Sequence, residues 1–252
     1  MREGHTHQIH ETCFWKHWDK RPALYRALSG IEHTLVGGRV TKYISFSLIP
    51  TGIVFSDRLV VVATDRRDLL SVLQSSLHSV WVEQLQTSMG QTLGYSISKC
   101  YVTWPWPRNL LAGHPRLLSE LGEQYMGARS SIMLSRQEGL TKTYNRFHNP
   151  DETSADIQKL RELHVEMDKA VAAAYGWSDL DLGHGFYETK QGLRFTISEP
   201  ARREVLARLL RLNHERYEEE VRQGLHDKKK GKGGGRKRQK SETDSPDLFE
   251  ES

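Results

Sequence analysis

The chain has 252 residues, enough to bury one good core or one medium domain with a helical appendage, and its net charge is +4. No stretch approaches twenty consecutive apolar residues and the His-rich polar start is not a signal peptide, so we expect a soluble, cytoplasmic protein with no membrane contact. Its two cysteines, Cys13 and Cys100, are too few and too far apart for a disulfide framework or a zinc site.

The chain begins with a predicted helical lead-in over residues 1–30, in which aromatic residues recur at helical spacing before Gly30. Short β-type runs follow, with turn signals at Gly37-Gly38 and Pro50–Gly52 between them. The predicted strands are Ile31–Val36, Arg39–Ile49 and Arg58–Ala63.

A helix is predicted from about Asp65 to Gln86, because apolar residues recur on one face of it. These residues are Leu69, Leu73, Leu77, Val80 and Trp81. A returning strand is then predicted from Tyr95 to Thr103, and it ends in Trp104-Pro-Trp-Pro107 because proline cannot continue the pairing. The sequence therefore predicts a small mixed α/β domain over residues 31–107. Tryptophans in such a position more often fill a core than stack on a base, so we expect Trp104 and Trp106 to be core residues.

From residue 108 to 225 the periodicity is helical, which predicts a helical C-terminal region and an α+β protein overall. One helix carries Leu117, Leu121, Tyr125, Ala128 and Ile132, and a second carries Ile157, Leu160, Met167 and Val171 before Gly176 ends it. A last helix begins at Ser198-Glu-Pro200.

Residues 226–252 predict a disordered tail, because they cannot bury apolar surface. Lys228–Lys240 holds eight lysines and arginines and no acidic residue, and the final twelve residues are acidic. Such a basic arm can bind phosphate non-specifically, and it can equally serve only to keep the protein soluble.

The sequence carries no strong catalytic motif. A phosphate-cradling Gly loop, a nucleophile elbow and a paired-His helix are all missing. Glu188-Thr-Lys190, with Asp179 and Asp181, has the form of a nuclease pattern, but we expect a solvated Gly-rich loop there. His5, His7, His10, His17 and Cys13 are irregularly spaced at a polar terminus, so we expect no metal site.

Two loops carry side chains that commonly contact nucleic acid. In Gly37–Tyr43 a flexible Gly pair lies beside Arg39, Lys42 and Tyr43, which can reach phosphate or guanine and stack on a base. The loop before the returning strand offers Ser88, Gln91 and Tyr95. The alternative for Arg39 and Lys42 is a surface strand edge protected by charge.

Several separated motifs, in one order, resemble the C-terminal part of the large bacterial type II DNA N6-adenine methyltransferases, including the MmeI-like fused restriction–modification and phage-defence enzymes. Arg39–Phe46, Ile53–Val60, Val72–Trp81 and Tyr95…Pro107 resemble elements of the target-recognition domain of that family. Gly139–Pro150, Leu163…Trp177 and Val205–Asn213 resemble its helical C-terminal region.

The resemblance implies a DNA-recognition role and departs from the family at two points. Gly94 stands where a basic or polar residue is common, and Asn149-Pro-Asp151 is not the base-holding Asn-Pro-Pro-aromatic loop, so we expect a turn there. We therefore expect the catalytic half, with its S-adenosylmethionine site, to lie on a partner or missing domain, and this chain alone to be inactive.

We interpret the chain as one that binds double-stranded DNA and presents it to a methyltransferase chain, if one is encoded nearby. Arg66, Arg67 and Lys99 would hold phosphates, and the two loops would touch base edges. An inactive remnant of a broken methyltransferase gene, or a protein-interaction module with a non-specific basic tail, are the alternatives.

Overall fold

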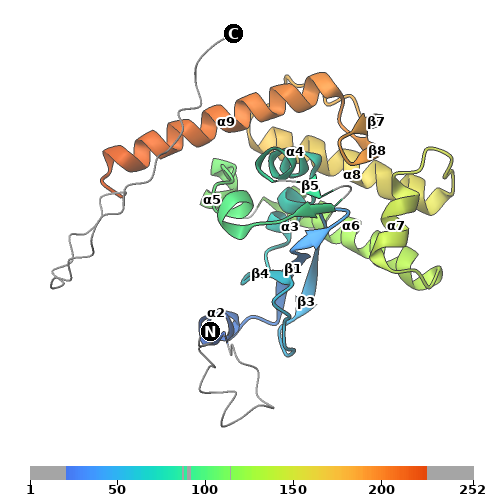
Figure 1. Ribbon diagram of the computed structural model, residues 1–252, viewed down its shortest axis with the longest axis horizontal. Helices are drawn as coiled ribbons and strands as arrows, with labels where there is room; N and C mark the ends of the chain where they lie inside the picture. The colour runs from blue at the N-terminus through green and yellow to red at the C-terminus, as the bar shows by residue number, and fades with distance from the viewer. Residues whose placement is uncertain (1–20, 87, 90–91, 114, 226–252) are drawn as a thin grey trace, which may run out of the picture. The chain divides into compact units, whose positions relative to one another are not determined.

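The computed structural model describes residues 21–86, 88–89, 92–113 and 115–225 (Figure 1). One compact unit ends at Arg216 and a second begins at Tyr217. The first unit is α+β, as the sequence predicts, with antiparallel sheets and helices that share buried apolar residues. In the described part of the chain no helix is long and apolar enough to cross a membrane.

The first sheet has the strand order β3-β1-β4, and all its pairs are antiparallel. Its strands are β1 (His33–Gly38), β3 (Phe46–Pro50) and β4 (Leu59–Val62), and the short helix α2 (Pro22–Leu28) precedes them. The prediction of a turn at Gly37-Gly38 is wrong, because both glycines belong to β1. A Cβ on Gly37 would lie 2.8 Å from the Phe46 ring, so the glycine lets this ring pack across the strand.

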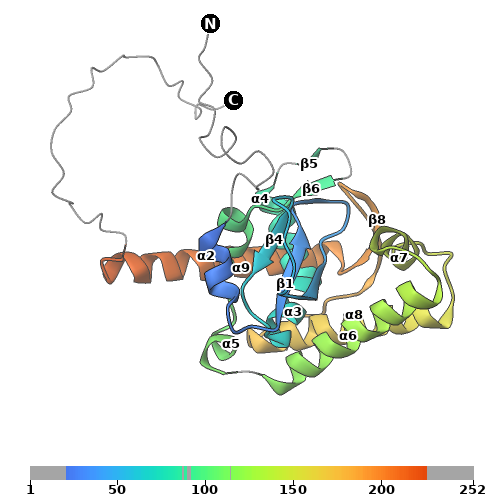
Figure 2. The same cartoon turned by 90° about the horizontal axis from the view of Figure 1, so that it is seen from below.

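A second small sheet joins two segments that are far apart in the sequence. Its strand order is β2-β6-β5, with β2 (Val40–Thr41), β5 (Ser88–Met89) and β6 (Thr92–Gly94). Val40 is paired with Gly94, and Ser88 with Leu93. Figure 2 shows β5 and β6 at one end of the first sheet.

The single helix expected from Asp65 to Gln86 is two helices, α3 (Arg67–Gln74) and α4 (Ser76–Leu85). Ser75 has extended backbone angles between them, and its hydroxyl donates to Val72 O at 2.7 Å and accepts from His78 N at 3.2 Å. The serine therefore caps both helices. The apolar stripe continues across the break, since Leu73 and Leu77 are both fully buried, which is why periodicity did not reveal it.

The strand expected over Tyr95–Thr103 is also wrong, because Ile97–Tyr101 form a short π-helical turn, η1. The residues alternate in polarity, but the structure buries Cys100 and Trp104, which are four residues apart, and leaves Val102 exposed. Trp104 is a core plug, as expected. It is 2% exposed, and its ring contacts Trp81, His78 and Tyr175.

The helical part contains α5 (Arg108–Ala112), α6 (Arg116–Ser135), α7 (Leu140–Phe147) and α8 (Ala155–Ala174). α8 buries the predicted face, and Gly176, two residues after its last residue, has a φ of 77° that stops the helix. On α6 the predicted stripe is wrong at Leu117, which is 59% exposed, because Leu118 is buried in its place. α6 packs against α3 and α8.

The Gly-rich segment expected to be a loop is an antiparallel hairpin of β7 (Gly185–Thr189) and β8 (Gly192–Thr196). α9 (Glu199–Arg222) follows it and begins where the sequence predicts. Its described part beyond Arg216 belongs to the second unit and is exposed. The predicted tail over residues 226–252 lies outside the described residues.

Candidate nucleic-acid interface

The two loops with predicted DNA contacts meet in the β2-β6-β5 sheet. Arg39 lies between β1 and β2, and its backbone N–H donates to Arg58 O at 2.9 Å. Its carbonyl accepts from Tyr95 N at 2.7 Å. Residue 39 therefore links the two sheets through its backbone, while its side chain is exposed.

A recess of about 550 Å³ opens beside Arg39. The Arg39 guanidinium makes no hydrogen bond or ion pair with the described residues, so it is free to meet a ligand. Apolar side chains border the recess, with Val40 73% exposed and Val102 70% exposed. Ser96 and Ser98 also line it, and their hydroxyls lie 3.0 Å apart. A cation, hydroxyls and apolar groups together match the acceptors, donors and methyl groups that a DNA major groove presents.

Tyr95 lines the same recess but is only 4% exposed. Its hydroxyl lies 3.0 Å from His78 Nε2, and its ring packs edge-on against Phe46. Burial raises the pKa of Tyr95. In this conformation Tyr95 forms part of the buried wall of the recess. Its predicted contact with a base stays a prediction.

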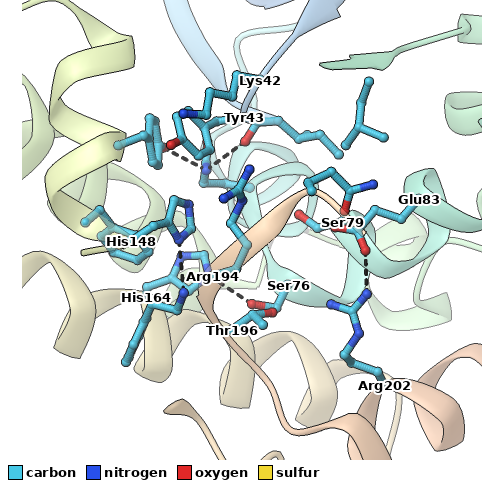
Figure 3. Close-up of a pocket in the computed structure, with 17 residues that line it drawn as sticks. Lys42, Tyr43, Ser76, Ser79, Glu83, His148, His164, Arg194, Thr196 and Arg202 are labelled. Atoms are coloured by element: carbon cyan, nitrogen blue, oxygen red, sulfur yellow. Dashed lines mark hydrogen bonds and ion pairs between the residues drawn. The ribbon is translucent and has the colours of Figure 1, made fainter. Parts of the chain in front are cut away.

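Lys42 and Tyr43 lie apart from Arg39, in a second recess (Figure 3). Both donate to Asn145 Oδ1 on α7, Lys42 Nζ at 3.1 Å and the Tyr43 hydroxyl at 2.7 Å. Tyr43 is 8% exposed and stacks on Tyr144 and His148. The helical part of the chain therefore fixes this predicted contact loop.

The three predicted phosphate contacts are placed differently from one another. Arg66 forms a two-bond ion pair with Asp68 and also donates to the Leu110 and Gly113 carbonyls, so its guanidinium is already occupied. Arg67 is half exposed and lies 3.7 Å from Glu123. Lys99 is exposed on η1. Arg67 and Lys99 can reach a phosphate without breaking a buried contact.

Two predicted residues have less structural description. Ser88 belongs to β5, where its backbone pairs with Leu93. Gln91 lies outside the described residues. Their predicted contacts with base edges stay predictions.

Sequence reasoning missed two arginines. Arg58 is exposed, and its carbonyl binds the Arg39 backbone. Arg194 lies on β8, and its guanidinium Cζ is 4.9 Å from the centroid of the Tyr43 ring. The alternation in Gly192-Leu-Arg-Phe-Thr196 is a strand signal that could have placed Arg194 on a hairpin.

The other sequence patterns show no site among the residues described. Asp179 is paired with Arg208 at 2.7 Å, so it is not free to join Asp181 and Glu188 in holding a metal. Residues 21–86, 88–89, 92–113 and 115–225 contain no group of three or more metal ligands. The predicted histidine cluster, from His5 to His17, lies outside these ranges. His78 is fully buried, so it is a packed histidine of the core.

Comparison with known proteins supports the resemblance over the first part of the chain. A solved structure of the type IIL restriction-modification enzyme MmeI in complex with DNA matches with a TM-score of 0.46 and 16% identity. The match covers 73% of this chain and 21% of that one, so this chain spans only a small part of its length. No curated protein matches. The model of the family described as "MmeI, target recognition domain" matches residues 18–108. Residues 18–108 are therefore similar to the target recognition domain of MmeI, as the sequence motifs indicate.

Proposed function

We propose that this chain recognises double-stranded DNA, and that the β2-β6-β5 sheet with the recess beside Arg39 is the surface that reads it. The observation that carries the proposal is the family match over residues 18–108, which includes all nine residues predicted to contact DNA. The pairing of the two predicted loops in one sheet supports it further, because it gives them one shared surface.

The predicted residues differ in how exposed their side chains are, and we assign them different roles on that basis. Arg39 is exposed and carries a planar fork of donors, which suits a bidentate contact with guanine. Arg67 and Lys99 hold phosphates and so fix the orientation of the duplex. Tyr43 and Tyr95 act by holding the loops in place, since their hydroxyls are engaged inside the protein. Arg66 instead joins the start of α3 to the end of α5.

The wider setting is part of the proposal. Recognition would serve an adenine-specific DNA methyltransferase of a restriction–modification or phage-defence system in the cytoplasm. The catalytic domain, with its S-adenosylmethionine site, would lie outside these 252 residues. This chain alone, incubated with DNA and tritiated S-adenosylmethionine, would then transfer no methyl groups; turnover by the isolated chain would contradict this part of the proposal.

Selection from a randomised duplex pool tests the recognition itself. The full chain is compared with a variant in which the eight lysines and arginines of Lys228–Lys240 are replaced by glutamine. We expect both proteins to enrich the same short sequence, because the recess and not the tail reads the bases. Enrichment of no sequence by either protein, with binding that disappears in the tail variant, would leave only a non-specific basic arm.

A further inference from the structure

The recess that contains Lys42 is built from several separate parts of the first unit (Figure 3). The loop after β2, the end of α7, α4, α8, β8 and α9 all supply part of its lining. Its volume is about 60 Å³. Since one water needs roughly 10–15 Å³ measured in this way, the recess has room for a few water-sized atoms or one small ligand group.

Two cations of this recess have no carboxylate partner among the described residues. Arg194 Nη1 donates to the Leu193 carbonyl at 2.9 Å, while Arg194 Nη2 is buried and makes no hydrogen bond. Lys42 Nζ has only the neutral Asn145 oxygen. A buried guanidinium nitrogen without an acceptor is costly, so an acceptor that entered the recess and bonded to it would be favoured.

The remaining charged pair of the recess cancels itself. Arg202 and Glu83 are joined at 2.5 Å. The charges of Glu83 and Glu188 also raise the pKa of Arg194, but its burial lowers that pKa by more, so these carboxylates do not fully compensate it. The pKa of His148 is held well below its ordinary value, first by burial and then by nearby positive charges, of which Arg194 contributes most. The surroundings of His148 are therefore positively charged. An anion is therefore the complement that the recess lacks.

Aromatic rings fix the position of the Arg194 guanidinium. It lies over the Tyr43 ring, and Tyr43 stacks on His148 with ring centroids 4.9 Å apart. His148 Nδ1 in turn accepts from the backbone N–H of Phe195, the residue after Arg194. A cation held in this way loses little conformational entropy when it binds a ligand.

We propose that Arg194 and Lys42 form a phosphate-binding site in this recess. The phosphate is either one in the DNA backbone or one on a free nucleotide or ion, and both would use the same donors. Binding of a DNA-backbone phosphate rests on the proposed DNA recognition, whereas binding of a free phosphate or nucleotide does not.

Titration calorimetry of the full chain with inorganic phosphate, at constant ionic strength, tests the site directly. We expect Arg194→Gln to weaken phosphate binding about tenfold or more, since a charge-assisted hydrogen bond contributes about 1.5–3 kcal/mol. Arg203→Gln is the matched control: it removes one arginine that is 79% exposed on α9, and it should leave phosphate binding unchanged. Lys42→Gln is the second variant, and weaker binding is expected there even if Arg194→Gln fails to fold.

The salt dependence of binding to a duplex distinguishes the two sources. A backbone phosphate predicts that Arg194→Gln lowers the slope of log K against log salt by about 0.9 relative to the control. Phosphate binding with an unchanged slope assigns the site to a free phosphate. If the chain bound no duplex, the proposed recognition would fail while calorimetry still decided the site. If Arg194→Gln and Lys42→Gln both left the phosphate affinity and the salt slope unchanged, the proposal would be overturned. Arg194 would then serve only to pack against the Tyr43 ring.

Discussion

Buried arginines connect the parts of the first unit at the level of single residues. Arg129 on α6 is 2% exposed and donates to Phe46 O at 2.8 Å, Ser47 Oγ at 2.7 Å and the Tyr144 hydroxyl at 3.0 Å. Arg161 on α8 is 4% exposed and donates to four backbone carbonyls at and after the end of α7. Each guanidinium therefore satisfies acceptors that would otherwise be buried without a partner.

Replacing Arg129 by methionine should strongly destabilise the protein. The methionine fills part of the volume but removes the donor of the Phe46 carbonyl and of Ser47 Oγ, while the Tyr144 hydroxyl keeps its bond from Gln74 Nε2. We expect this loss to cost about 2–4 kcal/mol in free energy of unfolding. Urea denaturation measures this loss. Arg203→Met, at an exposed position on α9, should change the free energy of unfolding by no more than about 0.5 kcal/mol. Equal effects of the two substitutions would contradict the role given to Arg129.

Buried histidines predict that the protein loses stability in mild acid. Burial lowers the pKa of His78 to about 3, and burial also lowers those of His148 and His164. The unfolded chain takes up protons on these rings near pH 6.5 and the folded chain does not. The free energy of unfolding is therefore highest above pH 6.5 and falls below it by up to about 1.4 kcal/mol per pH unit for each ring.

Urea denaturation at intervals between pH 7.5 and 5 measures this dependence. The His78→Gln variant should show a shallower fall than the wild type, because one of the rings that charges only on unfolding is gone. A wild-type free energy of unfolding that stayed constant over this range would contradict the neutral state of the buried rings.

Secondary-structure elements show what sequence could and could not predict. Periodicity located α8 and α9 because each buries one face over many turns. It missed the break at Ser75, where both flanking helices are buried, and it missed η1, where only a few residues decide the conformation. Tertiary packing settles such short segments. Arg39 is a prediction that rests on a signal visible in the sequence, an Arg beside a Gly pair, whereas the contact of Arg194 with Tyr43 joins residues far apart in the chain.

The packing of α3 on α6 depends on a glycine. A Cβ on Gly122 would lie 2.6 Å from the Arg67 carbonyl and 2.6 Å from Ser71 Oγ, whereas nothing lies within 4 Å of one on Gly127 in the same helix. Gly122→Ala should therefore lower the free energy of unfolding by about 1–3 kcal/mol, since the helices must move apart. Gly127→Ala should raise it by about 0.5–1 kcal/mol through helix propensity. Urea denaturation of both variants checks the pair, and a stable Gly122→Ala protein would show that the contact is looser than described.

Across the first unit, the predicted DNA-contacting loops and the helices form one structure. Asn145 on α7 holds Lys42 and Tyr43, and Arg129 on α6 holds the carbonyl of Phe46 in β3. The orientation of the recognition loops therefore depends on helices that come later in the chain. Under the proposed function, this arrangement would let the exposed Arg39 meet a duplex from a fixed position, and preorganised contacts discriminate better between bases than mobile ones.

The most direct measurement compares the affinity of Arg39→Gln and of Arg203→Gln, by fluorescence anisotropy of the full chain, for the duplex enriched in the selection and for a scrambled duplex. A base contact predicts that Arg39→Gln loses about 10- to 100-fold in affinity for the enriched duplex, equivalent to about 1–3 kcal/mol, and little for the scrambled one. Arg203→Gln should bind both duplexes as the wild type does. An equal loss on both duplexes, or no loss on either, would contradict the claim that Arg39 reads the DNA sequence.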